Sequence, residues 1–486
     1  MVNKKTSKEK PKNLKITKKP CFETWNKTTI NKAFDFAEGY KDFLNKVKTE
    51  KEAVIEGEKM AKAKGFKDLR KAKSIKAGDK IYFIQRNKSI IFAKIGKKKI
   101  HEGFNLIMSH IDSPRLDLKV TPLYEEENIA FLKTHYYGGI KKYQWPTVPL
   151  ALHGTIYLEN GNDVEVKIGE DEKDPVFMIT DLLPHLDRAG GPGTEIKPRE
   201  VQGEDLNLIF GSMPIEDDKN TKEAKEKVKE AILSYMYEKY GVKEADLSSA
   251  DLSAVPRERA RDLGIDRSLI SAYGHDDKIC AHSSLEALFN SNSLEKTQIC
   301  AWVDREEIGS EGTTGAQSIF FENFISELTE KNEGRTLGIG GVYKAFSRSR
   351  ALSADVTAGL DPDYKDVHDP RNAHRLGYGL AFEKYTGSGG KTSSSEASGE
   401  FLRDLRVALN KDKVVYQMGA GLGKVDQGGG GTIAKFMANR DIEIVDAGTP
   451  VFNMHAPLEI ASKADLYSAY LGYKAFYTNI KNYSER

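Results

Sequence analysis

Short apolar runs bounded by polar residues or glycine recur along the chain and predict buried strands. They span residues 81–84, 90–93, 104–108, 299–303, 351–356 and 442–448. Apolar residues at helical spacing predict helices over 29–64 and 221–240, which Gly65 and Gly241 would end. The stretch 299–319 predicts a buried strand, an acidic turn and a helix. In α/β sheets, ligands bind at the ends of such strands.

Residues 120–243 follow a different pattern, in which β-like segments alternate with glycine and proline. These segments include Tyr136-Tyr137-Gly138-Gly139, Leu150 to Leu158 and Val164 to Ile168. A self-contained block of this kind is a candidate inserted domain. The apolar face of its helix at 221–240 is more typical of ordinary core packing than of a partner site.

The length of 486 residues predicts two or three structural units, and a formal net charge of +2 argues against a nucleic-acid-binding protein. Residues 1–20 are rich in lysine, and we expect a disordered, solvated tail because they lack the apolar core of a secretory signal. The sequence has no apolar run long enough to span a bilayer, so no membrane partner is expected. Three cysteines without CxxC spacing predict reduced thiols, and a cytoplasmic enzyme fits best.

Acidic and histidine side chains follow four of the predicted strands. They are His110, Asp112, Glu306, Glu307, Asp355 and His455. Each has an ordinary alternative, because a surface histidine or a solvated acidic turn would have the same local sequence. The acidic pair Asp276-Asp277 opens a predicted helix, where an N-cap is the alternative. Together, these side chains would bring several possible metal ligands to one edge of the sheet.

Glu306 and Glu307 are adjacent in the acidic turn. Successive side chains of extended backbone point in opposite directions, so the two carboxylates cannot both serve in one chelate. One can bind a cation while the other faces a reacting group. This division suits metal-assisted hydrolysis.

Five motifs, read in order along the chain, resemble the M18 family of aminopeptidases. They are Ser109-His110-Ile111-Asp112-Ser113-Pro114, Gly274-His275-Asp276-Asp277-Lys278, Asp304-Arg305-Glu306-Glu307-Ile308-Gly309-Ser310, Ser353-Ala354-Asp355 and Met454-His455. The resemblance implies an α/β fold, with a mixed-sheet zinc-peptidase domain that carries helices on both faces and is interrupted by a β-rich oligomerisation domain. The peptidase domain would comprise residues 21–119 and 244–486, and the inserted domain residues 120–243.

Matching the motif positions implies a centre that holds two zinc ions. His110 and Asp355 would bind one ion, and Glu307 and His455 would bind the other. Asp276 would bridge the two ions. Such a set of imidazole and carboxylate ligands would also accept manganese or cobalt.

Three further features of the centre follow from the resemblance. Glu306 would be the general base that activates the attacking water. Asp112 would orient the imidazole of His110. The peptide bond between Asp276 and Asp277 would be cis.

Family members bring a histidine from the inserted domain of a neighbouring subunit into the active site. Residues 175–186 resemble that region and nominate His185 for this role. The alternative is that His185 only caps local structure. The resemblance also implies a homo-oligomer, of which the tetrahedral dodecamer is typical.

The expected substrates are peptides, from which the enzyme would remove the N-terminal residue. Where aspartyl aminopeptidases of this family carry a lysine suited to an acidic side chain, the resemblance aligns Glu383. Carboxylates there and at Asp361 would favour neutral or basic N-terminal residues, because like charges repel in a dry pocket. A shift of one residue would align Lys384 in place of Glu383, and both carboxylates could instead face solvent. A related carboxypeptidase or deacylase, and a metal-stabilised scaffold or cargo protein without turnover, are the alternative functions.

Overall fold

The computed structural model describes residues 14–16, 18–187, 199–216, 225–293, 295–420 and 422–480. The predicted inserted domain and the second part of the predicted peptidase domain include residues outside these ranges, at 188–198, 217–224, 294, 421 and 481–486. Two smaller predicted segments also fall partly outside them. They are the lysine-rich tail, at residues 1–13 and 17, and the predicted helix at 221–240, at residues 221–224.

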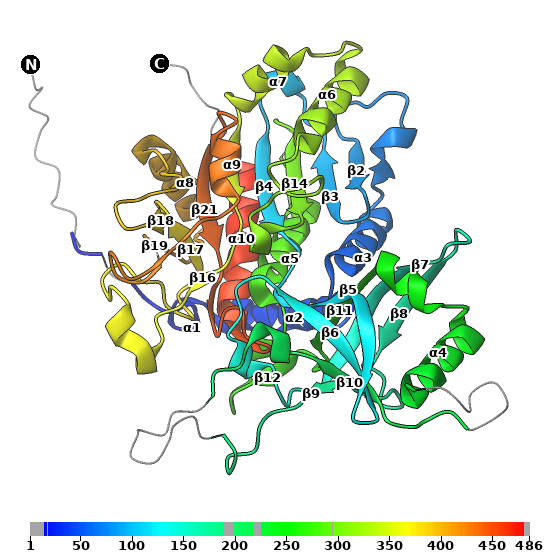
Figure 1. The fold of residues 1–486 in the computed structure, drawn as a ribbon. Helices are drawn as coiled ribbons and strands as arrows, with labels where there is room; N and C mark the ends of the chain where they lie inside the picture. The colour runs from blue at the N-terminus through cyan, green and yellow to red at the C-terminus, as the bar shows by residue number, and fades with distance from the viewer. Residues whose placement is uncertain are drawn as a thin grey trace, which may run out of the picture.

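A nine-stranded sheet forms the centre of the larger body of the molecule, as far as the chain is described (Figure 1). In spatial order its strands are β1 (Lys67–Asp68), β2 (Lys80–Gln85), β3 (Ser89–Lys94), β14 (Gln298–Val303), β4 (Asn105–His110), β15 (Arg350–Ser353), β21 (Glu443–Gly448), β17 (Leu380–Glu383) and β19 (Tyr416–Gly419). The central strands β14, β4, β15 and β21 are parallel, whereas β3 and β17 flank them in antiparallel orientation. The sheet is therefore mixed, as predicted.

Helices cover both faces of this sheet and enclose two hydrophobic cores. One core receives α2 (Lys27–Leu44), α3 (Glu50–Ala63), α5 (His275–Asn290), α8 (Gly399–Lys411) and α10 (Lys463–Asn479), and the other receives α6 (Phe320–Glu333), α7 (Ile339–Phe346) and α9 (Ala434–Ala438). Every residue of β14 is buried. Trp302 points into the first core and Val303 into the second, which is the alternation expected of a central strand. A short helix, α1 (Cys21–Thr24), precedes α2.

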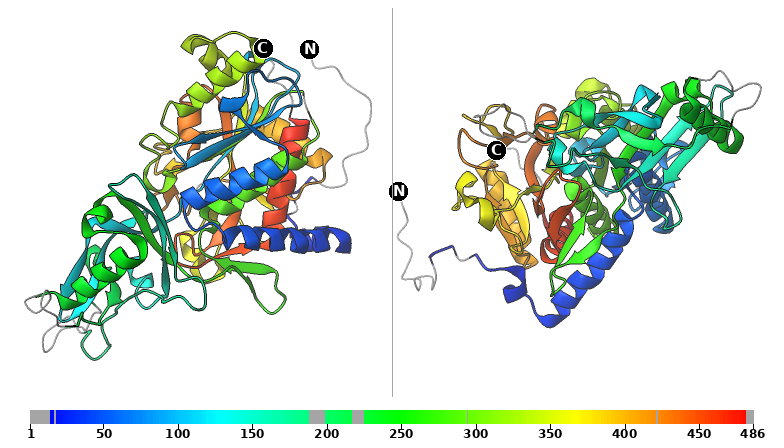
Figure 2. Two further views of the ribbon diagram at one scale, coloured as in Figure 1. Left: turned by 90° about the vertical axis from the view of Figure 1, so that its right-hand side faces the viewer. Right: turned by 60° about the horizontal axis from the view of Figure 1, so that its bottom comes forward.

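A seven-stranded antiparallel sheet with its own hydrophobic core projects from one side of the larger body (Figure 2). In spatial order its strands are β8 (Asp163–Ile168), β7 (Leu150–Tyr157), β11 (Ala250–Pro256), β5 (Arg115–Glu126), β6 (Ile129–Tyr137), β10 (Leu208–Gly211) and β9 (Met178–Ile179). The helix α4 (Lys227–Tyr240) packs on it through Val228. The predicted boundaries at 120 and 243 are wrong for this sheet, because the first falls inside β5 and the second excludes β11.

A five-stranded sheet brings distant segments of the chain together. Its order is β12 (Arg261–Leu263), β13 (Leu269–Ala272), β23 (Glu459–Ser462), β22 (Pro450–Phe452) and β16 (Thr357–Ala358), and a two-stranded ribbon pairs β18 (Gly387–Ser388) with β20 (Gly429–Gly430). Because β13 pairs with β23, the start of α5 lies beside the turn that joins β22 to β23. No helix in the described part of the chain has the length and apolar character needed to cross a bilayer.

The single helix predicted at 29–64 is wrong, because α2 ends at Leu44 and α3 begins at Glu50. Thr49 and Glu52 form a capping box at the start of α3, which satisfies backbone N–H groups at a new helix terminus. Helical spacing continues across the break, so spacing alone did not reveal it. Two other helices start later than expected, α6 at Phe320 and α4 at Lys227.

Candidate metal centre

Three of the predicted site segments meet at one edge of the nine-stranded sheet. His110 is the last residue of β4, and the parallel strands β14 and β15 lie on either side of it. The turn with Glu306 and Glu307 follows β14, and Asp355 follows β15. These side chains gather because the carboxyl ends of parallel strands share one edge, as the sequence pattern predicted.

Two further side chains reach this edge from the five-stranded sheet. Asp276 lies at the start of α5, which follows β13, and His455 lies in the turn between β22 and β23. The pairing of β13 with β23 places these two segments side by side. The peptide bond between Asp276 and Asp277 is cis, as predicted.

The carboxylate of Asp276 lies between two imidazoles. Its Oδ1 is 3.0 Å from Nε2 of His110, and its Oδ2 is 3.2 Å from Nε2 of His455. On one side, Oδ1 of Asp355 is 3.7 Å from His110 Nε2, and on the other, Oε2 of Glu307 is 3.4 Å from His455 Nε2. The five predicted ligands thus form two groups that share Asp276.

The donor set fits metal ions. Among the described residues, Oε1 of Glu307 and both carboxylate oxygens of Asp277 are buried without a hydrogen-bond partner, which is costly unless a cation is bound nearby. Asp277 also lies in a possible metal-binding group with His110 and Asp355, whose ligand atoms are within 4.8 Å of one another. Of the acidic pair Asp276-Asp277, the motif positions had assigned only Asp276 as a metal ligand. Imidazole and carboxylate donors of this kind suit zinc.

The pKa shifts of the clustered carboxylates and imidazoles also indicate that a cation binds among them. Burial, reinforced by the charge of Asp276, raises the pKa of the Glu307 carboxyl well above its usual value. Burial alone would lower the pKa of His110, but hydrogen bonds to its carboxylate neighbours raise it well above its usual value. The cluster therefore holds more negative charge than the protein alone stabilises, and bound cations would favour the ionised carboxylates and the neutral imidazoles.

Asp112 contacts both the histidine and the acidic turn. His110 Nδ1 lies 3.0 Å from the carbonyl oxygen of Asp112 and 3.3 Å from its Oδ1, which leaves Nε2 free to face the centre. The backbone N–H of Glu306 donates to Oδ1 of Asp112 at 3.2 Å, and that of Glu307 donates to Oδ2 at 3.1 Å. Asp112 thus holds the turn as well as the imidazole.

The two glutamates diverge for a reason other than the one predicted. Residues Glu306–Ile308 form a 3-10 turn rather than extended backbone, so the strand argument for their separation is wrong. Within this turn, the Glu307 side chain faces His455 and is 3% exposed. The Glu306 residue is half-buried, and burial together with the charge of Asp355 raises its pKa to about 8.

The remaining candidate residues lie outside this cluster. His185 follows β9, is exposed, and has no hydrogen-bond partner among the described residues of its own chain. Asp361 accepts a hydrogen bond from the backbone N–H of Asp363 at 2.9 Å. Glu383 is buried on β17 and accepts a hydrogen bond from the hydroxyl of Thr357. Lys384 is exposed, 3.8 Å from Glu396.

Sequence reasoning missed Glu459, a buried residue that opens β23. Its Oε1 accepts the backbone N–H of His455 at 2.8 Å, and its Oε2 accepts that of Asp276 at 3.0 Å. One signal was present, because a carboxylate directly before the apolar residues Ile460 and Ala461 follows the histidine of the last motif. Without the pairing of β13 with β23, however, its partner Asp276 could not be named.

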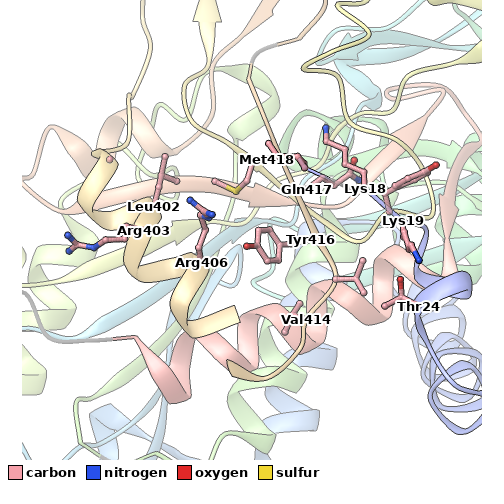
Figure 3. Close-up of a pocket in the computed structure, with 14 residues that line it drawn as sticks. Lys18, Lys19, Thr24, Leu402, Arg403, Arg406, Val414, Tyr416, Gln417 and Met418 are labelled. Carbon is pink, nitrogen blue, oxygen red and sulfur yellow. The ribbon is translucent and has the colours of Figure 1, made fainter. Parts of the chain in front are cut away.

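A cavity of about 730 Å³ lies away from the metal-binding cluster, beside α8 and β19 (Figure 3). Figure 3 shows Arg403 and Arg406 from α8 on one side and Lys18 and Lys19 on the other. None of the five predicted metal ligands lines it. The cavity therefore forms no part of the candidate centre, although two lysines of the predicted solvated tail line it.

Comparison with known proteins supports one assignment. A family model described as Aminopeptidase I zinc metalloprotease (M18) matches residues 43–477. Probable M18 family aminopeptidase 1 of Borrelia garinii is 48% identical over 451 residues, which cover 92% of this chain and 96% of the relative. The crystal structure of an M18 aminopeptidase from Thermotoga maritima has a TM-score of 0.89 and 40% identity, and the match covers 96% of this chain and 100% of that chain. The mApe1 dodecamer of S. cerevisiae, at 19% identity and a TM-score of 0.72, covers 92% of this chain and 97% of its own and shares the fold.

Proposed function

The chain belongs to the M18 family of zinc aminopeptidases, and from this premise we propose that it uses a two-zinc centre and Glu306 to remove N-terminal residues from peptides. The observation that carries the proposal is the Asp276 carboxylate, whose two oxygens face the imidazoles of His110 and His455. A carboxylate placed in this way can bind two cations at once. Manganese or cobalt could replace zinc in such a ligand set.

Five side chains would hold the ions. His110 and Asp355 would bind the first ion, Glu307 and His455 the second, and Asp276 both. When bound, zinc would polarise the scissile carbonyl and lower the pKa of the attacking water toward about 7. The imidazoles would bind as neutral groups, each through the Nε2 that already faces the carboxylates.

Glu306 would move the proton. Its side chain has no hydrogen bond among the described residues, so it remains free to reach substrate. The carboxylate would take a proton from the attacking water as the new C–O bond forms. It would then give this proton to the amide nitrogen as the C–N bond breaks, which releases the leaving amine without a buried charge.

The proposal is tested by hydrolysis of Leu-, Lys-, Asp- and Glu-aminoacyl substrates with the metal stripped by a chelator and then restored with zinc. We expect zinc-dependent release by the wild type and loss of release in Glu306→Gln with the metal still bound. Turnover that survives both chelation and Glu306→Gln would overturn the mechanism. Bound metal without turnover on any substrate would favour the scaffold alternative.

A neighbouring subunit would complete this active site through His185. In support, His185 is exposed, has no contact with the metal ligands of its own chain, and follows β9 of the projecting sheet. The mApe1 dodecamer shares the fold, which supports a homo-oligomer and, more specifically, a dodecamer. Analytical ultracentrifugation should show the oligomer, and His185→Ala should lose activity while the mass stays unchanged. A fully active His185→Ala enzyme would contradict the role.

Neutral or basic N-terminal residues would be preferred because of Glu383. Burial raises the pKa of this carboxyl to about 8, so its negative charge, and the repulsion of acidic substrates, would increase on the alkaline side of neutrality. Asp361 caps a local turn and would contribute less. The ratio of kcat/KM for Leu- over Asp-substrates should rise with pH in the wild type and stay level in Glu383→Gln. A preference for Asp or Glu that survives Glu383→Lys would refute the idea.

A further inference from the structure

A segment of three residues, Tyr137–Gly139, leaves the projecting seven-stranded sheet at the end of β6 and runs directly against the metal centre. Each residue of this segment contacts a different residue of the centre. Tyr137 contacts Asp112, Gly138 lies against Glu307, and Gly139 contacts His455. The proposed function uses none of these three contacts.

The Tyr137 hydroxyl donates a hydrogen bond to Oδ2 of Asp112 at 3.0 Å. The same oxygen accepts the backbone N–H of Glu307, so this phenol restrains the acceptor that holds the metal-binding glutamate. The Tyr137 ring is itself fixed, because the guanidinium of Arg115, its cross-strand neighbour, stacks 4.1 Å from the ring centroid. Arg115 in turn donates to Glu50 of α3 at 2.9 Å.

Gly138 has a φ of +78° and lies where a side chain would meet Glu307. A Cβ at this position would be 3.2 Å from Oε2 of Glu307 and 3.3 Å from its Cβ. Oε2 is the oxygen that faces His455. A larger residue here would strain the backbone and push the Glu307 side chain away, so both the conformation and the close approach favour glycine.

The carbonyl oxygen of Gly139 accepts a hydrogen bond from Nδ1 of His455 at 2.8 Å. With the proton held on Nδ1, the lone pair of Nε2 faces Asp276 and Glu307. The backbone carbonyl of Gly139 thus orients the imidazole of His455, as Asp112 orients the imidazole of His110. The structure provides no second carboxylate for this purpose among the described residues near Nδ1.

We propose that Tyr137–Gly139 is a positioning segment for the Glu307 and His455 half of the metal centre, through which the projecting sheet controls binding of the second metal ion. The proposal rests on the two-zinc function above. Gly138 and Gly139 contact this half directly, and Tyr137 reaches it through Oδ2 of Asp112, the oxygen that accepts the N–H of Glu307. His110 instead lies against the carbonyl oxygen and Oδ1 of Asp112. Loss of one contact should therefore weaken one ion more than the other.

The test is a cobalt(II) titration of the metal-stripped full-length oligomer, followed by visible absorption and by equilibrium dialysis of zinc. The variants are Tyr137→Phe, which removes only the hydroxyl, and Gly138→Ala, which adds the Cβ against Glu307. Loss of an outer-shell partner of a metal ligand weakens metal binding by about 10- to 100-fold. We expect a loss of this size for the second ion, an altered cobalt spectrum, and a first ion that still binds as in the wild type.

Two matched controls separate positioning from general damage. Tyr136→Phe removes a hydroxyl from the exposed neighbouring tyrosine, and Gly161→Ala adds a Cβ at a similar φ of +87° where it meets nothing within 4 Å. Both controls should bind two ions as the wild type does. Wild-type cobalt binding in Tyr137→Phe and Gly138→Ala would overturn the proposal, even if their melting temperatures fell. A wild type that binds fewer than two ions would instead overturn the two-zinc function on which the proposal rests.

Discussion

Oε2 of Glu459 accepts the backbone N–H of Asp276 at 3.0 Å, across 183 positions of the sequence. Its other oxygen accepts the N–H of His455, so one buried carboxylate fixes the backbone of two proposed ligands. Asp112 does the same for Glu306 and Glu307 on the opposite side. Three of the five proposed ligands, Asp276, Glu307 and His455, thus have their backbone N–H groups held by a buried carboxylate.

Replacing Glu459 by glutamine should destabilise the protein and weaken zinc binding. The amide nitrogen would face one of the two N–H groups, leaving a buried donor without an acceptor, at a cost of about 1–3 kcal/mol. Urea unfolding and zinc dialysis would measure the two effects. Glu330→Gln, on the exposed face of α6, is the control and should change neither. Wild-type values for Glu459→Gln would show that the pair of backbone contacts is dispensable.

Replacing Glu306 and Glu307 by glutamine should give different defects. Glu306→Gln should lower kcat by about 10²- to 10⁴-fold, because the proton acceptor is lost, and should retain both zinc ions. Glu307→Gln should lose metal as well as activity, because its side chain faces His455. Metal analysis alongside steady-state kinetics distinguishes the two. Equal zinc loss in both variants would contradict the division of roles.

Stripping the metal should lower the melting temperature. Only the folded chain brings these ligands together, so a bound ion stabilises the folded state, by about 2.7 kcal/mol for a free ion concentration of 100 times Kd. Thermal unfolding with and without chelator would measure the shift. In Asp276→Asn, which weakens the shared ligand of both ions, the chelator should cause a much smaller shift. A wild-type melting temperature that does not change when the chelator is added would argue against tight metal binding.

Acid should weaken the contact between α3 and the projecting sheet. Burial alone would raise the pKa of Glu52, but the hydrogen bond from His153 of β7, 2.9 Å long, helps to lower it to about 2, from an ordinary value of 4.5. Because the folded-state pKa is the lower one, the stabilisation is complete above about pH 4.5 and is lost as the pH falls toward 2. Urea unfolding between pH 6 and about 2 should show this loss in the wild type. The pH dependence should be smaller in Glu52→Gln, and an unchanged pH dependence in this variant would contradict the role of Glu52.

Much of the fold was predictable because its strands are continuous apolar runs. The runs at 299–303 and 351–356 became β14 and β15, and Glu306, Glu307 and Asp355, which follow these strands, reached one edge of the sheet because parallel strands end together. The break between α2 and α3 was missed because apolar spacing continues through it. Its capping box, Thr49 with Glu52, was the local signal that could have located it.

The contacts that hold the site were less accessible from the sequence. Glu459 and Gly139 act on backbone or imidazole N–H groups of residues far along the chain, and neither belongs to a motif. Their partners are determined by which strands pair, and a one-dimensional pattern does not determine that pairing. The predicted sequence boundaries of the projecting sheet were wrong for a similar reason, because β11 pairs with β5 and β7, which lie far from it in the sequence.

The position of β4 has a consequence for how the chain folds during synthesis. This strand ends at His110, yet its two neighbours in the sheet, β14 and β15, begin at Gln298 and Arg350. The projecting sheet, by contrast, is complete once β11 has left the ribosome at Pro256. In a nascent chain the projecting sheet could therefore form first, while both edges of β4 would stay unpaired until β14 and β15 have been made. Until then, these exposed strand edges could bind chaperones or pair with the wrong strand. The catalytic centre would be among the last parts of the protein to form.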